Sequence, residues 1–264
     1  MGLQLGNRVI PYYGLCMVLG VAAASLAGWK QAKLYRKSFD DLITIAGCAG
    51  LGGILGAKLL YLAVSWRSID WSRVLSDGGY LSALMGGGFV FYGGVIGAVL
   101  GAWTGGRIFR IVVGDYVQLA APCIPLGHAI GRLGCGLAGC CYGIPYSGPA
   151  AIVYENSLLA PAGVSLFPVQ FLESALEFIL AGVLFFYTDK HIERAKHGFE
   201  IYLGTYAVLR FFLEYLRGDE RGIYGGLSTS QWLSLALLAA VVWYTALWSR
   251  RRGNAGKTVK KGEG

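Results

Sequence analysis

Ionisable side chains interrupt the long apolar segments of this sequence at only a few positions. Each such group costs roughly 3 kcal/mol or more in hydrocarbon unless it pairs or faces a cavity, so these positions mark candidate functional sites. They are Lys58, His128, Arg132, Glu173, Glu177, Arg210 and Glu214. Six of them form three pairs whose members are four residues apart: His128 with Arg132, Glu173 with Glu177, and Arg210 with Glu214. This spacing places the two members of each pair on one face of a helix.

Arg132 and Arg210 are the two candidates for binding an anion. Both fall toward the outer ends of their apolar segments, where two guanidinium groups can each hold two phosphate oxygens. The alternative for Arg210 is an internal salt bridge with Glu214. Two phosphate-binding cations at bilayer depth indicate a phospholipid headgroup as ligand.

The segments that must position these residues are long and apolar. The chain has 264 residues, of which 55% are hydrophobic and 14% charged, whereas about a quarter of a soluble domain is charged. Most of the apolar segments are long enough to cross ~30 Å of hydrocarbon. They lie at 9–28, 42–64, 84–105, 116–138, 169–187, 199–216 and 227–248. We therefore expect an all-α polytopic membrane protein of about seven transmembrane helices, with a single transmembrane domain over residues 1–249.

The distribution of positive charge predicts the orientation. Of the basic residues, 15 lie in one set of alternate connections and the tail, and 5 lie on the opposite side. Since Lys and Arg are retained on the cytoplasmic side, we expect the N-terminus outside and the C-terminus in the cytoplasm of a cell (inner) membrane. Residues 250–264 form a basic tail that anionic lipid attracts, so the net charge of +8 does not indicate nucleic acid.

Glycine clusters accompany these segments. The four glycines between Gly50 and Gly56 favour close packing of helices, and those at 86–88 and 93–94 suit either close packing or broken backbone beside a cavity.

Several motifs, in order along the chain, resemble those of the prolipoprotein diacylglyceryl transferase family. Gly131-Arg132-Leu133-Gly134, with Gly139 and Gly143, resembles the family's signature G-R-x-G-N-F-x-N-x-E-x-x-G. Further blocks that match are Tyr13-Gly14, Gly53 to Tyr61, Gly86 to Gly97, Pro168 with Gln170 and Glu173, Arg210 to Arg217, and Leu227-Ser228 with Gln231. Together they cover most of residues 10 to 248.

The resemblance implies a seven-helix inner-membrane transferase. Its members move the diacylglyceryl group of phosphatidylglycerol to the lipobox cysteine thiol in the signal peptide of a preprolipoprotein, and release glycerol phosphate. By resemblance, Arg132 and Arg210 match two essential arginines, Glu214 orients the second of them, and Tyr13 lines the lipid cavity. Glu173, from the Pro-x-Gln-x-x-Glu block, joins these residues as a substrate-binding candidate.

This chain departs from the family pattern, and three of the departures introduce a tyrosine or a cysteine. Tyr92 stands in place of the family's histidine, and Cys135 and Cys140 replace the Asn and Glu of the signature. A thiol needs help to become a thiolate at neutral pH. Histidine titrates near neutrality, whereas a phenol is a poor base. We therefore expect His128 to accept the proton, and Tyr92 to orient the lipid or the thiol by a hydrogen bond.

Because of these departures, two functions other than diacylglyceryl transfer are also compatible with the sequence. One is an altered relative that binds or carries an anionic lipid with the same arginines. The other is a membrane thiol oxidoreductase that uses the cysteines, although no C-x-x-C pair is present.

The cysteines themselves allow three interpretations. They can be small buried residues, a redox pair of Cys135 with Cys140 or Cys141, or part of a metal site with Cys123 and His128. We assign no metal and no cofactor at this point.

Overall fold

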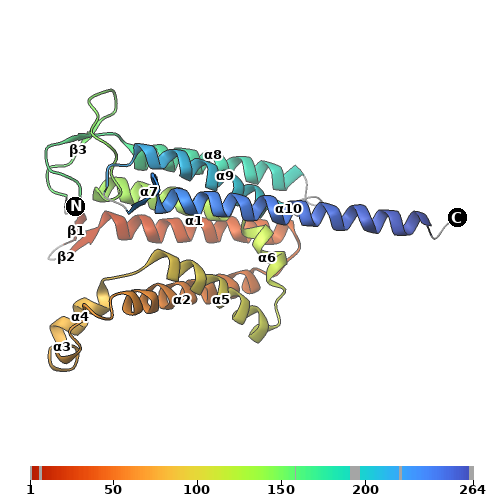
Figure 1. Ribbon diagram of the computed structural model, residues 1–264, viewed down its shortest axis with the longest axis horizontal. Coiled ribbons are helices and arrows are strands. Elements are labelled where there is room, and N and C mark those ends of the chain that lie inside the picture. The colour runs from red at the N-terminus through yellow and green to blue at the C-terminus, as the bar shows by residue number, and fades with distance from the viewer. Residues whose placement is uncertain (1, 6–7, 158, 191–196, 220–221, 262–264) are drawn as a thin grey trace. The chain divides into compact units, whose positions relative to one another are not determined.

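The computed structural model describes residues 2–5, 8–157, 159–190, 197–219 and 222–261. Arg194, Lys196 and Arg221, which contribute to the predicted orientation, lie outside these residues, as does the end of the basic tail at 262–264. The helices are α1 (Tyr12–Leu34), α2 (Phe39–Val64), α3 (Trp71–Ser76), α4 (Gly78–Gly86), α5 (Phe91–Phe109), α6 (Val113–Ala120), α7 (Cys123–Ala138), α8 (Val169–Lys190), α9 (Gly198–Leu213) and α10 (Thr229–Lys261), with a 3-10 turn η1 (Glu214–Leu216) (Figure 1).

The strands are short and pair as three antiparallel hairpins. They are β1 (Gly2–Leu5) with β2 (Arg8–Pro11), β3 (Ile152–Val153) with β4 (Ser165–Leu166), and β5 (Ile223–Tyr224) with β6 (Leu227–Ser228).

Among the described residues, four helical stretches are long and apolar enough to cross a membrane. They are α1, α2, residues 169–189 of α8 and residues 229–247 of α10, and α4 with α5 adds a fifth if this pair, bent by 73°, is one span. The prediction of an all-α multi-pass membrane protein is confirmed. The count of seven spans and the orientation of the termini stay predictions.

Two segments expected to be single helices are broken. Residues 116–138 divide into α6 and α7, and the break contains Pro122, which has no amide hydrogen to donate. Residues 84–105 divide between α4 and α5. There the buried Lys58 of α2 donates from Nζ to the carbonyl of Leu84 and, at 2.6 Å, to that of Gly87. Lys58 thus satisfies carbonyl groups that the broken helix leaves without helical partners.

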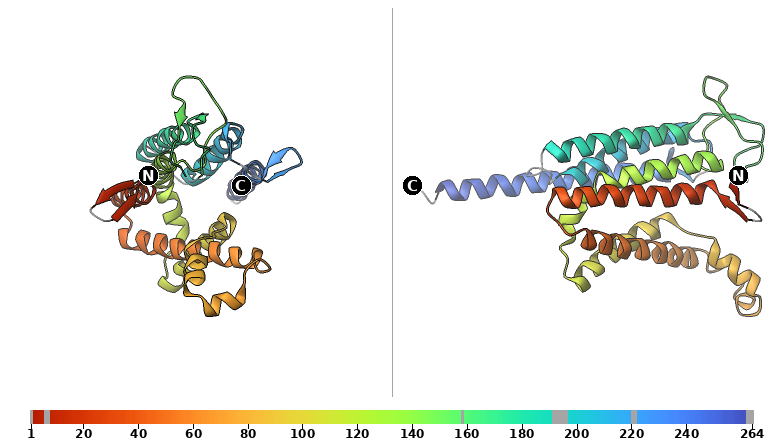
Figure 2. Two further views of the ribbon diagram at one scale, coloured as in Figure 1. Left: turned by 90° about the vertical axis from the view of Figure 1, so that its left-hand side faces the viewer. Right: turned by 180° about the vertical axis from the view of Figure 1, so that it is seen from behind.

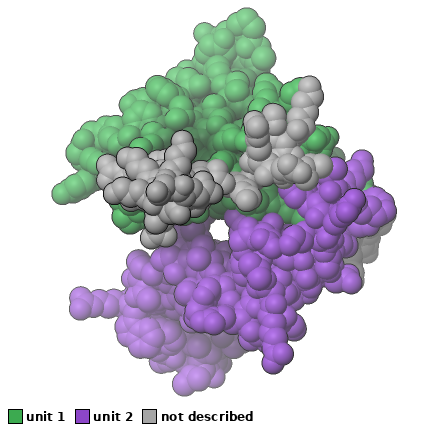
Figure 3. Space-filling view, turned by 90° about the vertical axis from the view of Figure 1, so that its right-hand side faces the viewer, with its two compact units in different colours: residues 1–27, 118–264 green, residues 28–117 purple. Residues whose placement is uncertain are grey.

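The chain divides into two compact units, residues 28–117 and residues 1–27 with 118–264 (Figure 3). In the unit of residues 28–117, α2 packs on α5 through facing glycines. A Cβ on Gly97 would lie 2.1 Å from the carbonyl oxygen of Gly52, and one on Gly56 would lie 2.3 Å from that of Gly93. The prediction that the Gly50–Gly56 cluster serves close packing is confirmed for Gly52 and Gly56.

This packing predicts a clear difference between two glycine substitutions. Gly97→Ala must push α2 and α5 apart, and overpacking of this kind costs about 1 to 3 kcal/mol. Gly50→Ala is the matched control, because a Cβ at Gly50 meets nothing within 4 Å. We expect Gly97→Ala to lower the thermal unfolding midpoint in detergent, while Gly50→Ala leaves it unchanged or raises it. Equal midpoints for the two variants would contradict the packing described.

The unit of residues 1–27 and 118–264 holds the candidate site. Within it, α7 packs on α8, α8 on α9, and α9 on α10. The first half of α1 approaches α7 closely, since a Cβ on Gly20 would lie 2.9 Å from the carbonyl oxygen of Gly127. These helices run along a common direction in Figures 1 and 2.

Backbone hydrogen bonds join the connection between α7 and α8 to the residues that follow α9. Ile144 donates its backbone N–H to the carbonyl of Leu216 at 3.0 Å, and Gly218 donates to that of Tyr142 at 3.0 Å. A small apolar cluster of Tyr154, Ala160 and Leu166 gives this connection a core of its own. The segment that follows α7 is therefore held beside the end of α9.

Candidate active site

Glu173 is the centre of a buried polar cluster in the unit of residues 1–27 and 118–264. It lies in the first turns of α8, 1% exposed. Its Oε1 lies 2.8 Å from Nη2 of Arg132 on α7, and its Oε2 lies 4.0 Å from Nη1 of Arg217. Arg210 of α9 also interacts electrostatically with Glu173. One carboxylate thus neutralises part of the charge of three arginines from separate elements.

His128 lies between two carboxylates of α8. Its Nδ1 is 3.3 Å from Oε1 of Glu177, and its Nε2 is 4.0 Å from Oε1 of Glu173. The prediction that His128 and Arg132 share a face of one helix is confirmed, because both contact Glu173. A carboxylate on Nδ1 fixes the ring so that Nε2 can accept a proton.

Arg210, near the end of α9, and Arg217, directly after η1, each pair with a nearby carboxylate. Arg210 Nη2 lies 2.6 Å from Oε2 of Glu214, so the salt bridge considered as the alternative role for Arg210 is present. Arg217 forms two hydrogen bonds with Asp219, from Nε at 2.9 Å and from Nη2 at 3.0 Å. Because each guanidinium has at least one carboxylate neighbour, the arginines can stay charged in a buried place.

Each of the three arginines has one buried nitrogen that donates no hydrogen bond within the described residues. Within the part of the chain that the structure describes, Arg132 Nε, Arg210 Nη1 and Arg217 Nη1 are buried without a hydrogen-bond partner. Buried donors are almost always paired in proteins, so unpaired ones of this kind indicate that a ligand completes the site. Three guanidinium donors suit a phosphate group, which accepts several charge-assisted hydrogen bonds.

The structure brings together six of the seven residues to which the sequence and the resemblance assigned a role in catalysis or substrate binding. Tyr13, at the start of α1, interacts electrostatically with Arg132, and joins His128, Arg132, Glu173, Arg210 and Glu214 in one unit. Tyr92 lies in the first turn of α5, in the other unit, with its side chain 36% exposed.

Three residues of the cluster had no assigned role in catalysis or substrate binding, although Glu177 was one of the ionisable residues found within the apolar segments. Glu177 and Tyr206 each lie one helical turn from a predicted residue, Glu173 and Arg210, and Tyr206 packs its ring 5.6 Å from that of His128. Arg217 closes the motif that begins at Arg210. The i,i+4 spacing already paired Glu177 with Glu173, the same spacing from Arg210 could have found Tyr206, and the motif could have found Arg217.

The cysteines group differently from the metal set that the sequence left open as one alternative. The sulfur atoms of Cys135, Cys140 and Cys141 all lie within 4.8 Å of one another. The set with Cys123 and His128, one of the three interpretations left open, does not form, because Cys123 precedes Cys135 by twelve residues on one helix, about 18 Å of axial rise. All six cysteines have free thiols.

Arg217 links the cysteines to the arginine cluster, since it interacts with Cys141 by charge and by a hydrogen bond. Hydrogen bonds from the Cys135 and Cys140 thiols, followed by the positive charge of Arg217, lower the pKa of the Cys141 thiol. Hydrogen bonding to Cys135 and Cys141 raises the pKa of Cys140. The cluster therefore favours one thiolate, on Cys141, that its neighbours stabilise.

Comparison with known proteins agrees with the motifs. The family model for prolipoprotein diacylglyceryl transferase matches residues 1–247. A phosphatidylglycerol–prolipoprotein diacylglyceryl transferase of Clostridium tetani is 37% identical over 224 residues, which cover 84% of this chain and 87% of the relative. A second one, of Clostridium perfringens, is 36% identical and covers 86% of each chain, and one of Dehalococcoides mccartyi is 32% identical over 97% of this chain and 96% of the relative. The chain belongs to the prolipoprotein diacylglyceryl transferase family.

Proposed function

We propose that this protein transfers the diacylglyceryl group of phosphatidylglycerol to the lipobox cysteine thiol of a preprolipoprotein. The observation that carries the proposal is the set of three buried guanidinium groups, each with an unpaired donor, around Glu173. The relatives named above have this activity in their names, and the match extends over most of both chains.

The transfer breaks a bond between a glycerol carbon and a phosphate oxygen. The thiolate sulfur attacks that carbon and forms a thioether, while the electron pair of the C–O bond goes to the leaving glycerol phosphate. Negative charge therefore grows on the phosphate oxygens in the transition state. Arg132 and Arg210 are the residues we assign to stabilise it, because fixed cations in a dry site lower this barrier more than water does.

The other polar residues position these two. Glu173 orients Arg132, and Glu214 orients Arg210. His128, held by Glu177, is the proposed proton acceptor for the thiol. Tyr13 lies beside Arg132, where it can contact the lipid, and Tyr92 is proposed to orient the lipid or the thiol by a hydrogen bond.

We further propose that the protein lies in the inner membrane with seven spans. The segments of α6 with α7, of α4 with α5, and of α9 add three spans to the four apolar helices. The basic residues then place the N-terminus outside and the tail from Arg250 in the cytoplasm, where anionic lipid holds it.

Complementation tests the proposed function. A strain depleted of its own diacylglyceryl transferase should grow when it expresses this protein, and a model lipoprotein should show the mobility shift of the lipidated form. The matched control is the same lipoprotein with its lipobox cysteine changed to serine, which should not shift. A well-inserted protein that binds phosphatidylglycerol and yields no shift would favour a lipid carrier instead.

A further inference from the structure

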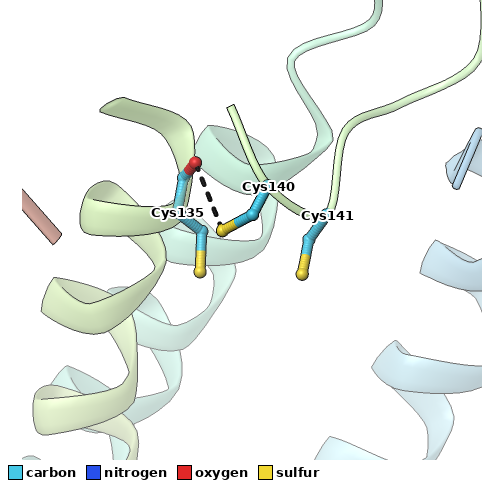
Figure 4. A group of neighbouring side chains, drawn as sticks. All are labelled: Cys135, Cys140 and Cys141. Atoms are coloured by element: carbon cyan, nitrogen blue, oxygen red, sulfur yellow. Dashed lines mark hydrogen bonds between the residues drawn. The ribbon is translucent and has the colours of Figure 1, made fainter. Parts of the chain in front are cut away.

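Three sulfur atoms converge where α7 ends. Cys135 lies in the last turn of α7, and Cys140 and Cys141 lie in the segment that follows. Their sulfurs are within 4.8 Å of one another. Figure 4 shows the three side chains gathered beside the end of α7. Each residue is partly buried. None of the roles proposed above for the arginines and glutamates uses these thiols.

The backbone around the cluster is held in an uncommon conformation. Gly139 ends α7 with a φ of 75°, and a Cβ there would lie 2.4 Å from Oγ of Ser157, so only glycine fits. Cys141 has a φ of 56°, which is uncommon for a residue with a side chain.

Tertiary contacts keep the chain in this conformation. Gln170 Nε2 donates to the carbonyl oxygen of Cys140 at 2.9 Å, and the Tyr154 hydroxyl donates to that of Gly136 at 2.7 Å. Backbone hydrogen bonds at Tyr142 and Ile144 fix the next residues to the end of α9. The convergence of the sulfurs is therefore built into the fold.

The geometry suits a thiophilic metal ion. Zinc binds thiolate sulfur at about 2.3 Å, which puts two sulfurs of one tetrahedron about 3.8 Å apart. Sulfurs that already lie within 4.8 Å need to move by roughly 1 Å or less to bind one ion. Thiolate ligands select zinc and copper(I) over magnesium or calcium.

The charge around the cluster suits the metal as well. Three thiolates and one divalent cation carry a net charge of −1. Arg132 and Arg217 both interact with Cys141, so positive charge is present to balance the bound complex. A buried ion is tolerated when its charge is compensated in this way.

We propose that Cys135, Cys140 and Cys141 bind one Zn²⁺ ion whose fourth position takes the acceptor thiol. This inference rests on the transfer proposed above. Three protein ligands and one open position are the arrangement of catalytic zinc sites. A thiol that coordinates zinc is deprotonated, so the ion supplies the thiolate that the transfer consumes.

The position of the ion fits the reaction. Cys135 follows Arg132 by three residues on α7, which places both on neighbouring turns of one helix face. The thiol on the metal then lies next to the phosphate that Arg132 holds. His128 is seven residues from Cys135, about 10 Å along the helix, so the thiol proton reaches it through water.

The bonds balance without any change of oxidation state. The acceptor S–H loses its proton to water and then to His128, and its sulfur binds zinc. The sulfur attacks the glycerol carbon and forms the C–S bond, and the C–O bond breaks with its electrons on the phosphate. The neutral thioether is a poor zinc ligand and leaves, which frees the fourth position.

Metal binding is measured first on the full chain in detergent. The protein is stripped with a chelator and reloaded with Zn²⁺ alone. We expect about one zinc per chain by elemental analysis, with three sulfur neighbours at about 2.3 Å by X-ray absorption. Cys135→Ser, Cys140→Ser and Cys141→Ser should each lower zinc affinity at least ten-fold, and the control Cys48→Ser should not. Uptake of Cu⁺ without Zn²⁺, or a disulfide among the three with no uptake after reduction, would overturn the inference.

The role of the open position is measured in two ways. Removal of zinc from the unmodified protein should lower transfer to a lipobox peptide at least ten-fold, and Zn²⁺ should restore it. Co²⁺ in the same site should change its absorption spectrum when the lipobox peptide is added, but not when its cysteine is replaced by serine. The spectrum needs no lipid transfer, so it tests the site separately from the activity.

These results distinguish the two proposals. Full transfer by the zinc-free protein would overturn the metal inference and leave the proposed function standing. A cobalt spectrum that responds to the thiol, in a protein that transfers nothing, would overturn the proposed function and support the metal site. A spectrum that ignores the thiol would overturn the assignment of the fourth position.

Discussion

Arg132→Ala and Arg210→Ala are each expected to lower the transfer rate by about 10²- to 10³-fold while the protein still inserts in the membrane. Removal of one preorganised charge donor from a dry site has effects of this size, because water cannot replace it there. Both guanidinium groups are largely buried, and each keeps one nitrogen without a hydrogen-bond partner among the described residues. The measurement is the rate of diacylglyceryl transfer per folded molecule, with insertion checked separately.

Two further variants sharpen this test. Arg132→Lys and Arg210→Lys should restore little activity, because an ammonium is a point charge and cannot present two donors to two phosphate oxygens. Arg107→Ala is the control, since Arg107 is exposed on α5 and stacks on Trp103. Near-normal turnover in either alanine variant would remove that arginine from the phosphate site.

The buried ion pairs could be predicted from the sequence. Ionisable residues are costly in apolar segments, and the i,i+4 spacing placed His128 with Arg132 and Arg210 with Glu214 on shared faces. The structure has both arrangements. The packing glycines at Gly52 and Gly56 were predictable for a similar reason, because small residues at helical spacing permit close approach.

The breaks in the helices and the thiol cluster were not predictable in the same way. Hydropathy shows that residues 84–105 are apolar, but it cannot show that Lys58, from another helix, stabilises a bend there. The distance between Cys135 and Cys141 depends on a left-handed backbone at Gly139 and Cys141 and on the contact of Tyr142 with Gly218. Long-range contacts of this kind leave no periodic pattern in the sequence.

The sequence and the structure give different pictures of Arg217. Charge counting alone placed it in an outer connection, as an ordinary basic residue. In the structure its side chain is 1% exposed, and it lies between Glu173, Asp219 and Cys141. It therefore connects the proposed phosphate site with the proposed metal site, a position that only the folded chain reveals.

His128→Gln is expected to lower the transfer rate by about 10²-fold or more. The amide can still hydrogen-bond Glu177, but it cannot take up the thiol proton, and general base catalysis contributes about 10²- to 10⁴-fold. The measurement is the direct transfer assay across pH, with zinc held saturating.

Tyr92→Phe is the companion variant, and it should lose at most about ten-fold with an unchanged pH profile. A neutral hydrogen bond contributes about 1 kcal/mol, which is roughly a factor of five in rate. The Tyr92 side chain is more than one third exposed, so its loss should not disturb the fold. The opposite pattern would reverse the two roles. If His128→Gln keeps the rate and the pH profile while Tyr92→Phe loses orders of magnitude, the phenol and not the imidazole is the group that handles the proton.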